Sequence, residues 1–230
     1  MFLRPCLPTQ RVCATHAGQC DDLLVLPFGN PTREAYAPLL WPQIVTRLVL
    51  FTRFAKAGRA KTRLAKDLGN IKAAELQRQM TRRLGHQASA AGFEHVDYLW
   101  ADLPAHMPGK RQVVADLGMR MARGLRGSSP VLLMGTDLPL VATKDLQILR
   151  RGLMSHPFVM APAADGGYWA IGIRAPSFLP KITMALTAHL DAAAMIHLLG
   201  AHRLFVGPTR DDCDDLSDYL RLNLGAGLRM

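Results

Sequence analysis

The stretch from Val131 to Pro139, which reads VLLMGTDLP, constrains the fold more than any other part of the chain. Four apolar residues in a row, Val131 to Met134, suit a strand that is buried on both faces, as in a parallel sheet. The run stops at Gly-Thr-Asp, so we expect Asp137 at the carboxyl end of this strand. In open parallel sheets this edge binds ligands, because the loops that leave the strands form a crevice there.

A carboxylate at such an edge needs a partner, because burying it unpaired is costly or protonates it. One candidate partner is a helix N-terminus, since Thr136 or Asp137 could cap a helix that begins near Thr143. The other is a divalent metal that carries phosphate, because Mg2+ prefers one or two carboxylates together with phosphate oxygens and water. The stretch itself leaves both interpretations open.

Almost all of the net charge of +10 lies in one window of the chain. Ile44 to Arg83 holds eleven Lys or Arg residues against two acids, whereas the segments before and after are nearly balanced. Such a window attracts phosphates, either those of a nucleotide or those of a nucleic acid backbone. For Arg78, Arg82 and Arg83 the simplest interpretation is a solvated helix face.

The basic window begins with an apolar, β-branched segment, Val45 to Phe51, which predicts a first strand. A loop follows at once, Thr52 to Leu64, with Gly58 at its middle and five basic residues around that glycine. A strand followed by a basic, glycine-containing loop can wrap a polyphosphate through side-chain charge and backbone N–H groups. The loop has neither the GxxxxGK[ST] pattern of Walker loops nor the GxGxxG pattern of dinucleotide turns.

Predicted strands and helices alternate along the rest of the chain, which favours an α/β fold with a mainly parallel sheet. The further strands are predicted at residues 95–101, 131–134, 158–161, 170–173 and 203–206. The helices are predicted at residues 73–91, 116–125, 143–153 and 187–199, with an acidic turn and a final helix over 211–222.

Residues 1–43 are rich in proline and lack a lasting hydrophobic period, so we expect an irregular extension before a single domain at residues 44–230. The extension lacks the apolar core of a secretory signal, and no apolar run approaches the roughly 18 residues of a membrane span. Three of the four cysteines lie in the extension without a CxxC pair, which favours free thiols over a zinc site. These features predict a cytoplasmic protein.

Several short motifs occur in order along the chain. They are KTRL at Lys61–Leu64, DLGMRM at Asp116–Met121, GTDLP at Gly135–Pro139, DGGY at Asp165–Tyr168 and DCDDLSDYL at Asp212–Leu220. In this order and spacing they resemble the DUF2064 family of bacterial glycosyltransferase-like proteins. The resemblance covers about residues 45–222. It implies the nucleotide-diphospho-sugar transferase fold, also called GT-A, which is a Rossmann-like, single-domain, three-layer sandwich.

The resemblance also implies a metal-dependent transferase with Mg2+ or Mn2+ as cofactor and a nucleotide-activated donor as partner. The expected reaction moves a sugar from a nucleoside diphosphate sugar to a small-molecule acceptor. In this fold the basic loop holds the nucleotide phosphates, and the DLGxRM segment approaches the base. The implied nucleotide-binding residues are Thr52, Arg53, Gly58, Arg59, Lys61, Arg63, Asp116 and Gly118.

The remaining residues that the resemblance implies concern the metal and the substrate. Asp137 stands where relatives bind the catalytic divalent ion, and Asp212 and Asp214 match a late DxD that often supplies a second metal contact. The acceptor or sugar side is implied for the turn that consists of Asp165, Gly166, Gly167 and Tyr168.

The chemistry of such a transfer agrees with these residue types. The charge of the leaving diphosphate must be neutralised by cations and a metal that are positioned in advance. Lys61 and Arg63 would supply the cations and Asp137 would hold the metal, so we expect Lys61, Asp137 and Asp165 to be catalytic. Asp165 could act as a general base or bind a hydroxyl group. The adjacent glycine pair could let the chain pass close to a substrate or could form a plain hairpin.

Two other functions stay open. One is nucleotidyl transfer, in which a nucleoside triphosphate donates a nucleoside monophosphate and releases pyrophosphate. The other is a nucleic-acid-binding protein that uses the basic window. The second is disfavoured, because Phe51 and Phe54 are the only aromatic residues interleaved there for base stacking.

The boundary at residue 43 can be tested by truncation. Because the extension carries no matched motif and no hydrophobic period, we expect a chain that begins at Pro42 to fold and to keep nucleotide binding. Circular dichroism and thermal melts of the shortened and the full chain test this expectation. Aggregation of the shortened chain would show that the extension covers apolar surface.

Overall fold

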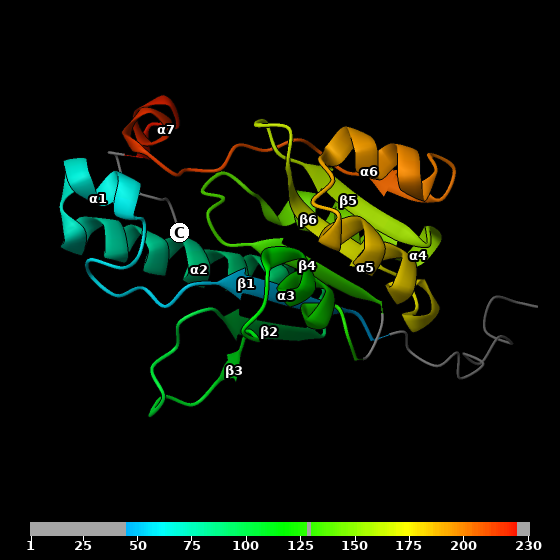
Figure 1. Ribbon diagram of the computed structural model, residues 1–230. Coiled ribbons are helices and arrows are strands. Elements are labelled where there is room, and N and C mark those ends of the chain that lie inside the picture. The colour runs from blue at the N-terminus through cyan, green and yellow to red at the C-terminus, as the bar shows by residue number, and fades with distance from the viewer. Residues whose placement is uncertain (1–44, 128–129, 225–230) are drawn as a thin grey trace, which may run out of the picture. The chain divides into compact units, whose positions relative to one another are not determined.

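A computed structural model describes residues 45–127 and 130–224 as a seven-stranded sheet with helices on both faces (Figure 1). The strands are β1 (Arg47–Thr52), β2 (His95–Trp100), β3 (Lys110–Arg111), β4 (Val131–Gly135), β5 (Phe158–Pro162), β6 (Tyr168–Ile173) and β7 (Leu204–Val206). The helices are α1 (Thr62–Leu68), α2 (Asn70–Ala90), α3 (Leu117–Gly124), α4 (Thr143–Ser155), η1 (Pro176–Phe178), α5 (Leu179–Thr187), α6 (Ala192–Leu199) and α7 (Leu216–Arg221). No helix in these ranges is both long and apolar enough to cross a membrane. The predicted extension lies outside the described residues, so the domain boundary stays a prediction.

The strand order in the sheet is β3-β2-β1-β4-β6-β5-β7, and β6 runs antiparallel to both of its neighbours. The other pairings are parallel, which confirms the expected mainly parallel sheet. From β1 the chain continues to β2 on one side and later to β4 on the other, so the strand order reverses between β1 and β4. Such a reversal opens a crevice at the carboxyl ends of the strands.

Alternating side chains of the strands build a core on each face of the sheet. Leu50 and Met134 pack on one face with α2 and α4, while Val49 and Leu133 pack on the other with α3, α5 and α6. Figure 1 shows α3 and α5 in front of the sheet and α2 behind it. This arrangement confirms the predicted three-layer α/β fold.

The largest difference from the sequence prediction is in the helix expected at residues 187–199. The helix in that range, α6, begins only at Ala192, and the preceding helix α5 over Leu179–Thr187 was not predicted. His189 adopts a left-handed conformation with φ of 52°, and the Asp191 carboxylate accepts a hydrogen bond from the Ala194 N–H at 2.8 Å. A left-handed residue ends a helical path, and a capping aspartate starts a new one. The short elements β3 and α1 were also not predicted.

A polar cluster fixes the starts of the first two strands. The N–H and hydroxyl of Thr46 donate to Glu94 Oε2 at 2.7 and 2.5 Å, and Arg150 of α4 donates to Glu94 Oε1 at 2.9 Å. Burial acts to raise the pKa of Glu94, but the hydrogen bonds from Thr46 and Arg150 outweigh it and lower this pKa to about 2. The cluster therefore contributes to stability only while Glu94 is ionised.

We expect Glu94→Gln to lower the free energy of unfolding at pH 7 by about 1 kcal/mol, since the bonds to a charged group are lost. The value is modest because the Glu94 side chain is 41% exposed. The pKa of Glu94 in the folded state lies below the usual value of about 4.3. The stability that the ionised Glu94 adds is therefore fully present above a pH of about 4.3, and it is lost as the pH falls through about 2. Urea unfolding of the wild type and the variant at pH 7 and at pH 3 measures the loss of stability and its dependence on pH. Asp67→Asn changes an exposed carboxylate of α1 as the control, and equal losses in the two variants would contradict the assignment.

Candidate functional site

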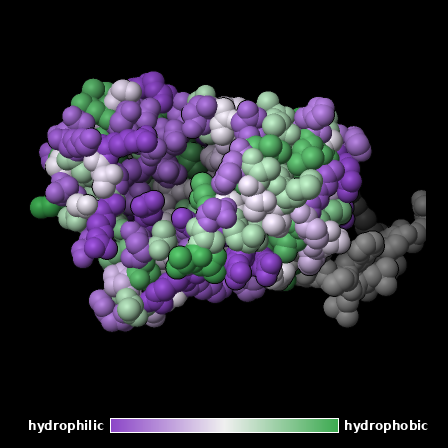
Figure 2. Space-filling model, in the orientation of Figure 1, coloured by the Kyte–Doolittle hydropathy of each residue, from purple (hydrophilic) through white to green (hydrophobic). Residues whose placement is uncertain are grey.

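A cavity of about 370 Å³ lies at the carboxyl ends of β1 and β4, where the strand order reverses. Figure 2 shows hydrophilic side chains around a hollow on the half of the molecule that carries α1 and α7. Two acids, Asp137 and Asp214, are among the residues that line the cavity. The basic residues that line it are Arg53, Arg59, Lys61, Arg63 and Arg120. Because the basic side chains outnumber the acids, the cavity favours polyanions such as a nucleotide polyphosphate.

The loop between β1 and α1 turns at two residues with positive φ. Gly58 has φ of 76°, and Lys61, directly before α1, has φ of 48° and ψ of 50°. A residue with a Cβ in this left-handed conformation is strained by roughly 1–2 kcal/mol. The Lys61 side chain is only 6% exposed and is bound by two carboxylates, which offsets this strain.

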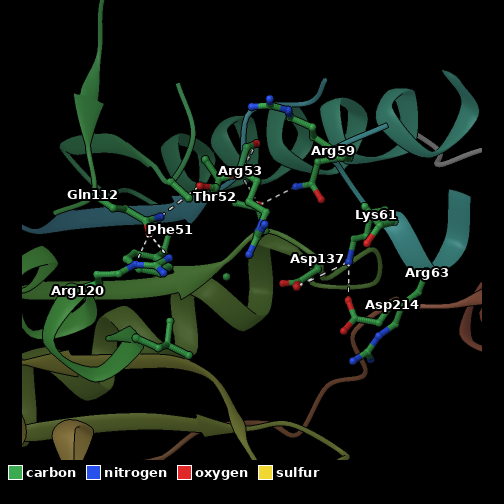
Figure 3. A pocket seen from close by; sticks show the side chains of 16 residues that line it. Phe51, Thr52, Arg53, Arg59, Lys61, Arg63, Gln112, Arg120, Asp137 and Asp214 are labelled. Carbon is green, nitrogen blue, oxygen red and sulfur yellow. Dashed lines mark hydrogen bonds and ion pairs between the residues drawn. The ribbon is translucent and has the colours of Figure 1, made fainter. Parts of the chain in front are cut away.

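The Lys61 ammonium joins two carboxylates that are far apart in the sequence. Its Nζ lies 2.8 Å from Asp214 Oδ1 and 3.7 Å from Asp137 Oδ2, as the dashed lines in Figure 3 show. The side chains of Asp137 and Asp214 are 42% and 43% exposed, so both carboxylates stay open to a ligand. One ion-paired cluster therefore connects the loop after β1, the loop after β4 and the segment before α7.

Cys213 places the two late aspartates of the DxD at the site. Its side chain is fully buried with Leu64 in the apolar cluster between α1, α2 and α7, and its N–H donates to the Asp137 carbonyl at 2.9 Å. Burial raises the pKa of the Cys213 thiol to about 11, so this free cysteine acts in packing. With Cys213 turned into the core, Asp212 and Asp214 on either side of it reach the cavities. The other three cysteines lie outside the described residues.

Asp137 does not cap the helix that follows it. The residue before α4 is Ala142, whose N–H donates to Asp145 Oδ2 at 2.9 Å. Arg210 Nε also donates to Asp145 Oδ2 at 2.9 Å, so Asp145 is paired as well. The capping interpretation of Thr136 and Asp137 is therefore wrong, because an aspartate inside the first turn satisfies the helix start instead.

A buried hydrogen-bond network lies under the cavity. The hydroxyls of Thr52 and Thr136 are 2.7 Å apart, and those of Thr52 and Thr81 are 3.3 Å apart. Gln77 Nε2 donates to Thr136 at 3.0 Å and to Thr81 at 3.2 Å. All four side chains are at most 5% exposed. Because these bonds are satisfied inside the protein, they hold the ends of β1 and β4 rigidly against α2.

A second cavity of about 240 Å³ adjoins the first, and Asp137 lines both. Asp165, Gly167 and Tyr168, which were predicted on the substrate side, line it together with Asp212. Burial raises the pKa of Asp212, and the negative charges of Asp214, Asp137 and Asp165 raise it further. The second cavity is therefore acidic where the first is basic.

The turn at the second cavity is a hairpin between β5 and β6. Gly166 has φ of 92°, which favours glycine, and does not line the cavity. The Asp165 carboxylate accepts a hydrogen bond from the Gly167 N–H at 2.9 Å. The glycine pair thus lies in a hairpin with Gly167 at the cavity, and the bond holds Asp165 in place at the cavity wall.

Three residues predicted at the nucleotide do not line the first cavity. Asp116 caps α3, because its carboxylate accepts a hydrogen bond from the Met119 N–H at 2.9 Å. Gly118 is buried between α3 and α5, where an added Cβ would clash with the carbonyl of Leu186. Gly58 turns the basic loop without facing the cavity. These three residues therefore lie outside the cavity lining, and their predicted contacts with a nucleotide stay predictions.

Two residues that were not predicted, Gln112 and Arg120, form one wall of the first cavity. Gln112 Oε1 accepts from Arg120 Nε at 2.9 Å, and Gln112 Nε2 donates to the carbonyls of Leu99 and Thr52 at 2.9 and 3.2 Å. The Arg120 guanidinium lies 5.5 Å from the centre of the Phe51 ring (Figure 3). Arg120 is the arginine of the DLGMRM motif, and of this motif Leu117 and Arg120 line the cavity whereas Asp116 and Gly118 do not.

Asp137 and Asp214 are the residues that fit a divalent ion. Both carboxylates contact one cation, the Lys61 ammonium, and Mg2+ is commonly held by one or two carboxylates and phosphate oxygens. Across residues 45–127 and 130–224, no three His, Cys, Asp or Glu side chains are grouped to hold a metal ion. The predicted set of Asp137, Asp212 and Asp214 is therefore not assembled as a three-carboxylate site.

The Lys61–Asp214 pair can be measured with a double-mutant cycle of Lys61→Met and Asp214→Asn. We expect a coupling of about 1 kcal/mol in the free energy of urea unfolding at pH 7, because the buried lysine is weakly screened. The control is the Arg221–Asp211 pair, which has the same 2.8 Å distance but side chains 50% and 36% exposed. Its coupling should be near zero. Equal coupling in the two pairs would show that burial of Lys61 does not strengthen its ion pair.

Comparison with solved structures finds this fold in transferases. A candidate nucleotide-diphospho-sugar transferase from Desulfovibrio desulfuricans G20 is 25% identical, with a TM-score of 0.68 over 78% of this chain and 85% of that chain. A 4-diphosphocytidyl-2C-methyl-D-erythritol synthase from Anaerococcus prevotii DSM 20548 is 9% identical, with a TM-score of 0.50 over 79% and 97%. Rv0371c from Mycobacterium tuberculosis H37Rv, solved in complex with manganese, is 21% identical, with a TM-score of 0.43 over 77% and 96%. The first likeness agrees with the expected transferase class.

A search of curated proteins gave no match to this chain. The model of the family described as an uncharacterized protein conserved in bacteria, DUF2064, matches residues 70–187. This range is more than half of the chain and includes the DLGMRM, GTDLP and DGGY motifs. The chain therefore belongs to the DUF2064 family.

Proposed function

We propose that this protein is a metal-dependent glycosyltransferase that moves a sugar from a nucleoside diphosphate sugar to a small acceptor. The observation that carries the proposal is the pair of adjoining cavities that share Asp137, one basic and one acidic. The basic side chains of the first cavity suit a diphosphate. The second cavity is smaller and lined by carboxylates and the aromatic side chains of Tyr168 and Trp169, which suits the hydroxyl groups and ring of a sugar. The similar Desulfovibrio protein, a candidate nucleotide-diphospho-sugar transferase, supports the use of a sugar nucleotide as donor.

In the proposed reaction the bond between the sugar and the diphosphate breaks, and negative charge grows on the diphosphate. Lys61, Arg53 and Arg63 line the cavity in which that charge develops. Groups that are in place before the reaction stabilise this charge without reorganisation, and Lys61 meets that condition because carboxylates already hold it. A divalent ion, Mg2+ or Mn2+, held by Asp137 and Asp214 would add positive charge against the diphosphate.

Other residues of the two cavities bind and orient the reactants in this proposal. Arg120 and Gln112 hold each other against Phe51, so they can position the nucleoside part of the donor. Asp165 has one oxygen bound to the Gly167 N–H and faces the second cavity. We assign it to the acceptor hydroxyl, either as the group that binds it or as the base that accepts its proton.

Nucleotidyl transfer is the second candidate function. The first cavity holds five basic side chains, which would suit the three phosphates of a nucleoside triphosphate as well as a diphosphate. In that reaction pyrophosphate leaves and the acceptor attacks the phosphorus next to the nucleoside. The two reactions use different donors, so donor preference distinguishes them.

Thermal melts with nucleoside diphosphate sugars and nucleoside triphosphates, each with Mg2+, Mn2+ or a chelator, test the proposal. We expect nucleotide and metal together to stabilise the fold more than either does separately. A ligand at about 100 times its Kd adds about 2.7 kcal/mol to the free energy of unfolding, which raises the Tm by several degrees. The largest shift with a sugar nucleotide favours glycosyl transfer, and the largest with a triphosphate favours nucleotidyl transfer.

Asp137→Asn provides the decisive variant because it removes a charge and keeps the shape. Its Tm without ligand should fall only slightly, because the 3.7 Å contact of Asp137 with Lys61 is the longer of the two and Asp214 still pairs with Lys61. The metal-dependent part of the shift should disappear. Asp67→Asn alters an exposed carboxylate of α1 and should keep the full shift. If no nucleotide shifts the wild type with any metal, the donor-site proposal fails.

A further inference from the structure

A third cavity of about 370 Å³ lies beside α2, near the carboxyl ends of β1 and β2. It shares only Arg53 with the first cavity and no residue with the second. No carboxylate is among the residues that line it. These residues are Arg53, Phe54, Ala55, Arg78, Thr81, Arg82, Tyr98 and Trp100.

Three aromatic rings form one side of this third cavity. The rings of Tyr98 and Trp100 are stacked with centres 5.8 Å apart and planes 12° apart. Phe54 meets Trp100 edge to face, with ring centres 6.2 Å apart and planes 68° apart. All three residues are half-buried, so the aromatic surface is fixed by packing and is still open to a ligand. A planar ring could stack on such a surface.

Two arginines of α2 supply positive charge to the third cavity. Arg78 and Arg82 are four residues apart and so lie on the same face of the helix. Arg78 is paired with Glu75. Arg82 is exposed and forms no ion pair or hydrogen bond within the described part of the chain. The cavity therefore holds at least one arginine whose charge is not neutralised by the protein.

The combination of rings and arginines indicates one class of ligand. We propose that the third cavity binds a small organic anion that carries a planar ring, with the ring on Trp100 and the anionic group at Arg82. A volume of about 370 Å³ suits a small molecule. A single-stranded nucleic acid would need a longer series of stacking residues, and the three rings here are confined to one cavity.

The third cavity is linked to the first cavity through a hydrogen bond and a shared residue. Thr81, which lines the third cavity, shares a hydrogen bond with Thr52, which lines the first. Arg53 lines both cavities, and its side chain points into the first (Figure 3). A ligand in the third cavity would therefore contact residues that fix the shape of the first cavity. The binding proposal itself does not depend on the function proposed for the first cavity.

Isothermal titration calorimetry with phenyl phosphate tests the proposal, with phenol and inorganic phosphate as ligands that carry only one of the two groups. We expect phenyl phosphate to bind more tightly than either. Arg82→Ala and Trp100→Leu should each weaken binding about tenfold, because one loses the charge and the other the stacking surface. Trp100→Phe keeps a ring and should retain most of the affinity. Arg63→Ala, which alters only the first cavity, should leave the affinity unchanged.

Three results would overturn the proposal. The first is wild-type affinity in Arg82→Ala or in a folded Trp100→Leu variant, with folding checked by circular dichroism. The second is a loss of binding in Arg63→Ala, because the ligand would then occupy the first cavity. The third is tighter binding of a single-stranded oligonucleotide with a steep salt dependence, which would assign the rings and arginines to nucleic acid. Arg82 is on the exposed face of α2, so its variant tests the proposal even if Trp100→Leu does not fold.

Discussion

The contact of the Lys61 ammonium with Asp214 and Asp137 is the interaction on which the geometry of the site depends. It joins segments that follow β1 and β4 to a segment that precedes α7, and Lys61 and Asp214 are 153 residues apart in sequence. Lys61 adopts a left-handed backbone conformation, with φ of 48°, at this position. The burial of Cys213 and its bond to the Asp137 carbonyl fix the third segment. The ion pairs of Lys61, its strained backbone and the packing of Cys213 therefore together determine where Asp137 and Asp214 lie.

The first cavity combines a rigid floor with adaptable walls. The floor is the satisfied hydroxyl and amide network around Thr52 and Thr136, which is almost fully buried. The walls include Arg53, Arg59 and Arg63. These three residues are exposed, so their long side chains can adjust to a ligand. The floor holds the ends of β1 and β4 in place, and the exposed arginine side chains of the walls suit the proposed phosphate ligand. The buried network under the cavity and the exposed arginines around it explain how the first cavity can have a fixed floor and still admit a ligand.

Local patterns predicted most of the fold, and long-range contacts account for most of what was missed. The apolar run at 131–134 identified the central strand β4, because burial on both faces leaves a continuous signal. The helix α5 was not predicted and the start of α6 was placed too early, since only His189 and Asp191 mark the break between them. Gln112 lies in no periodic segment, and its role depends on Arg120 and on two strand carbonyls. Such a role is visible only after the chain has folded.

In the proposed reaction, the opposite charges of the two adjoining cavities favour one orientation of the donor. A diphosphate placed in the second cavity would lie against Asp165 and Asp212, and the pKa of Asp212 is already raised by burial and by neighbouring carboxylates. The same diphosphate in the first cavity meets basic side chains from the loop after β1 and from α3. Asp137 stands at the boundary, where it lines both cavities and contacts Lys61. In the proposed reaction the bond that breaks would therefore lie beside Asp137, with phosphate on its basic side and sugar on its acidic side.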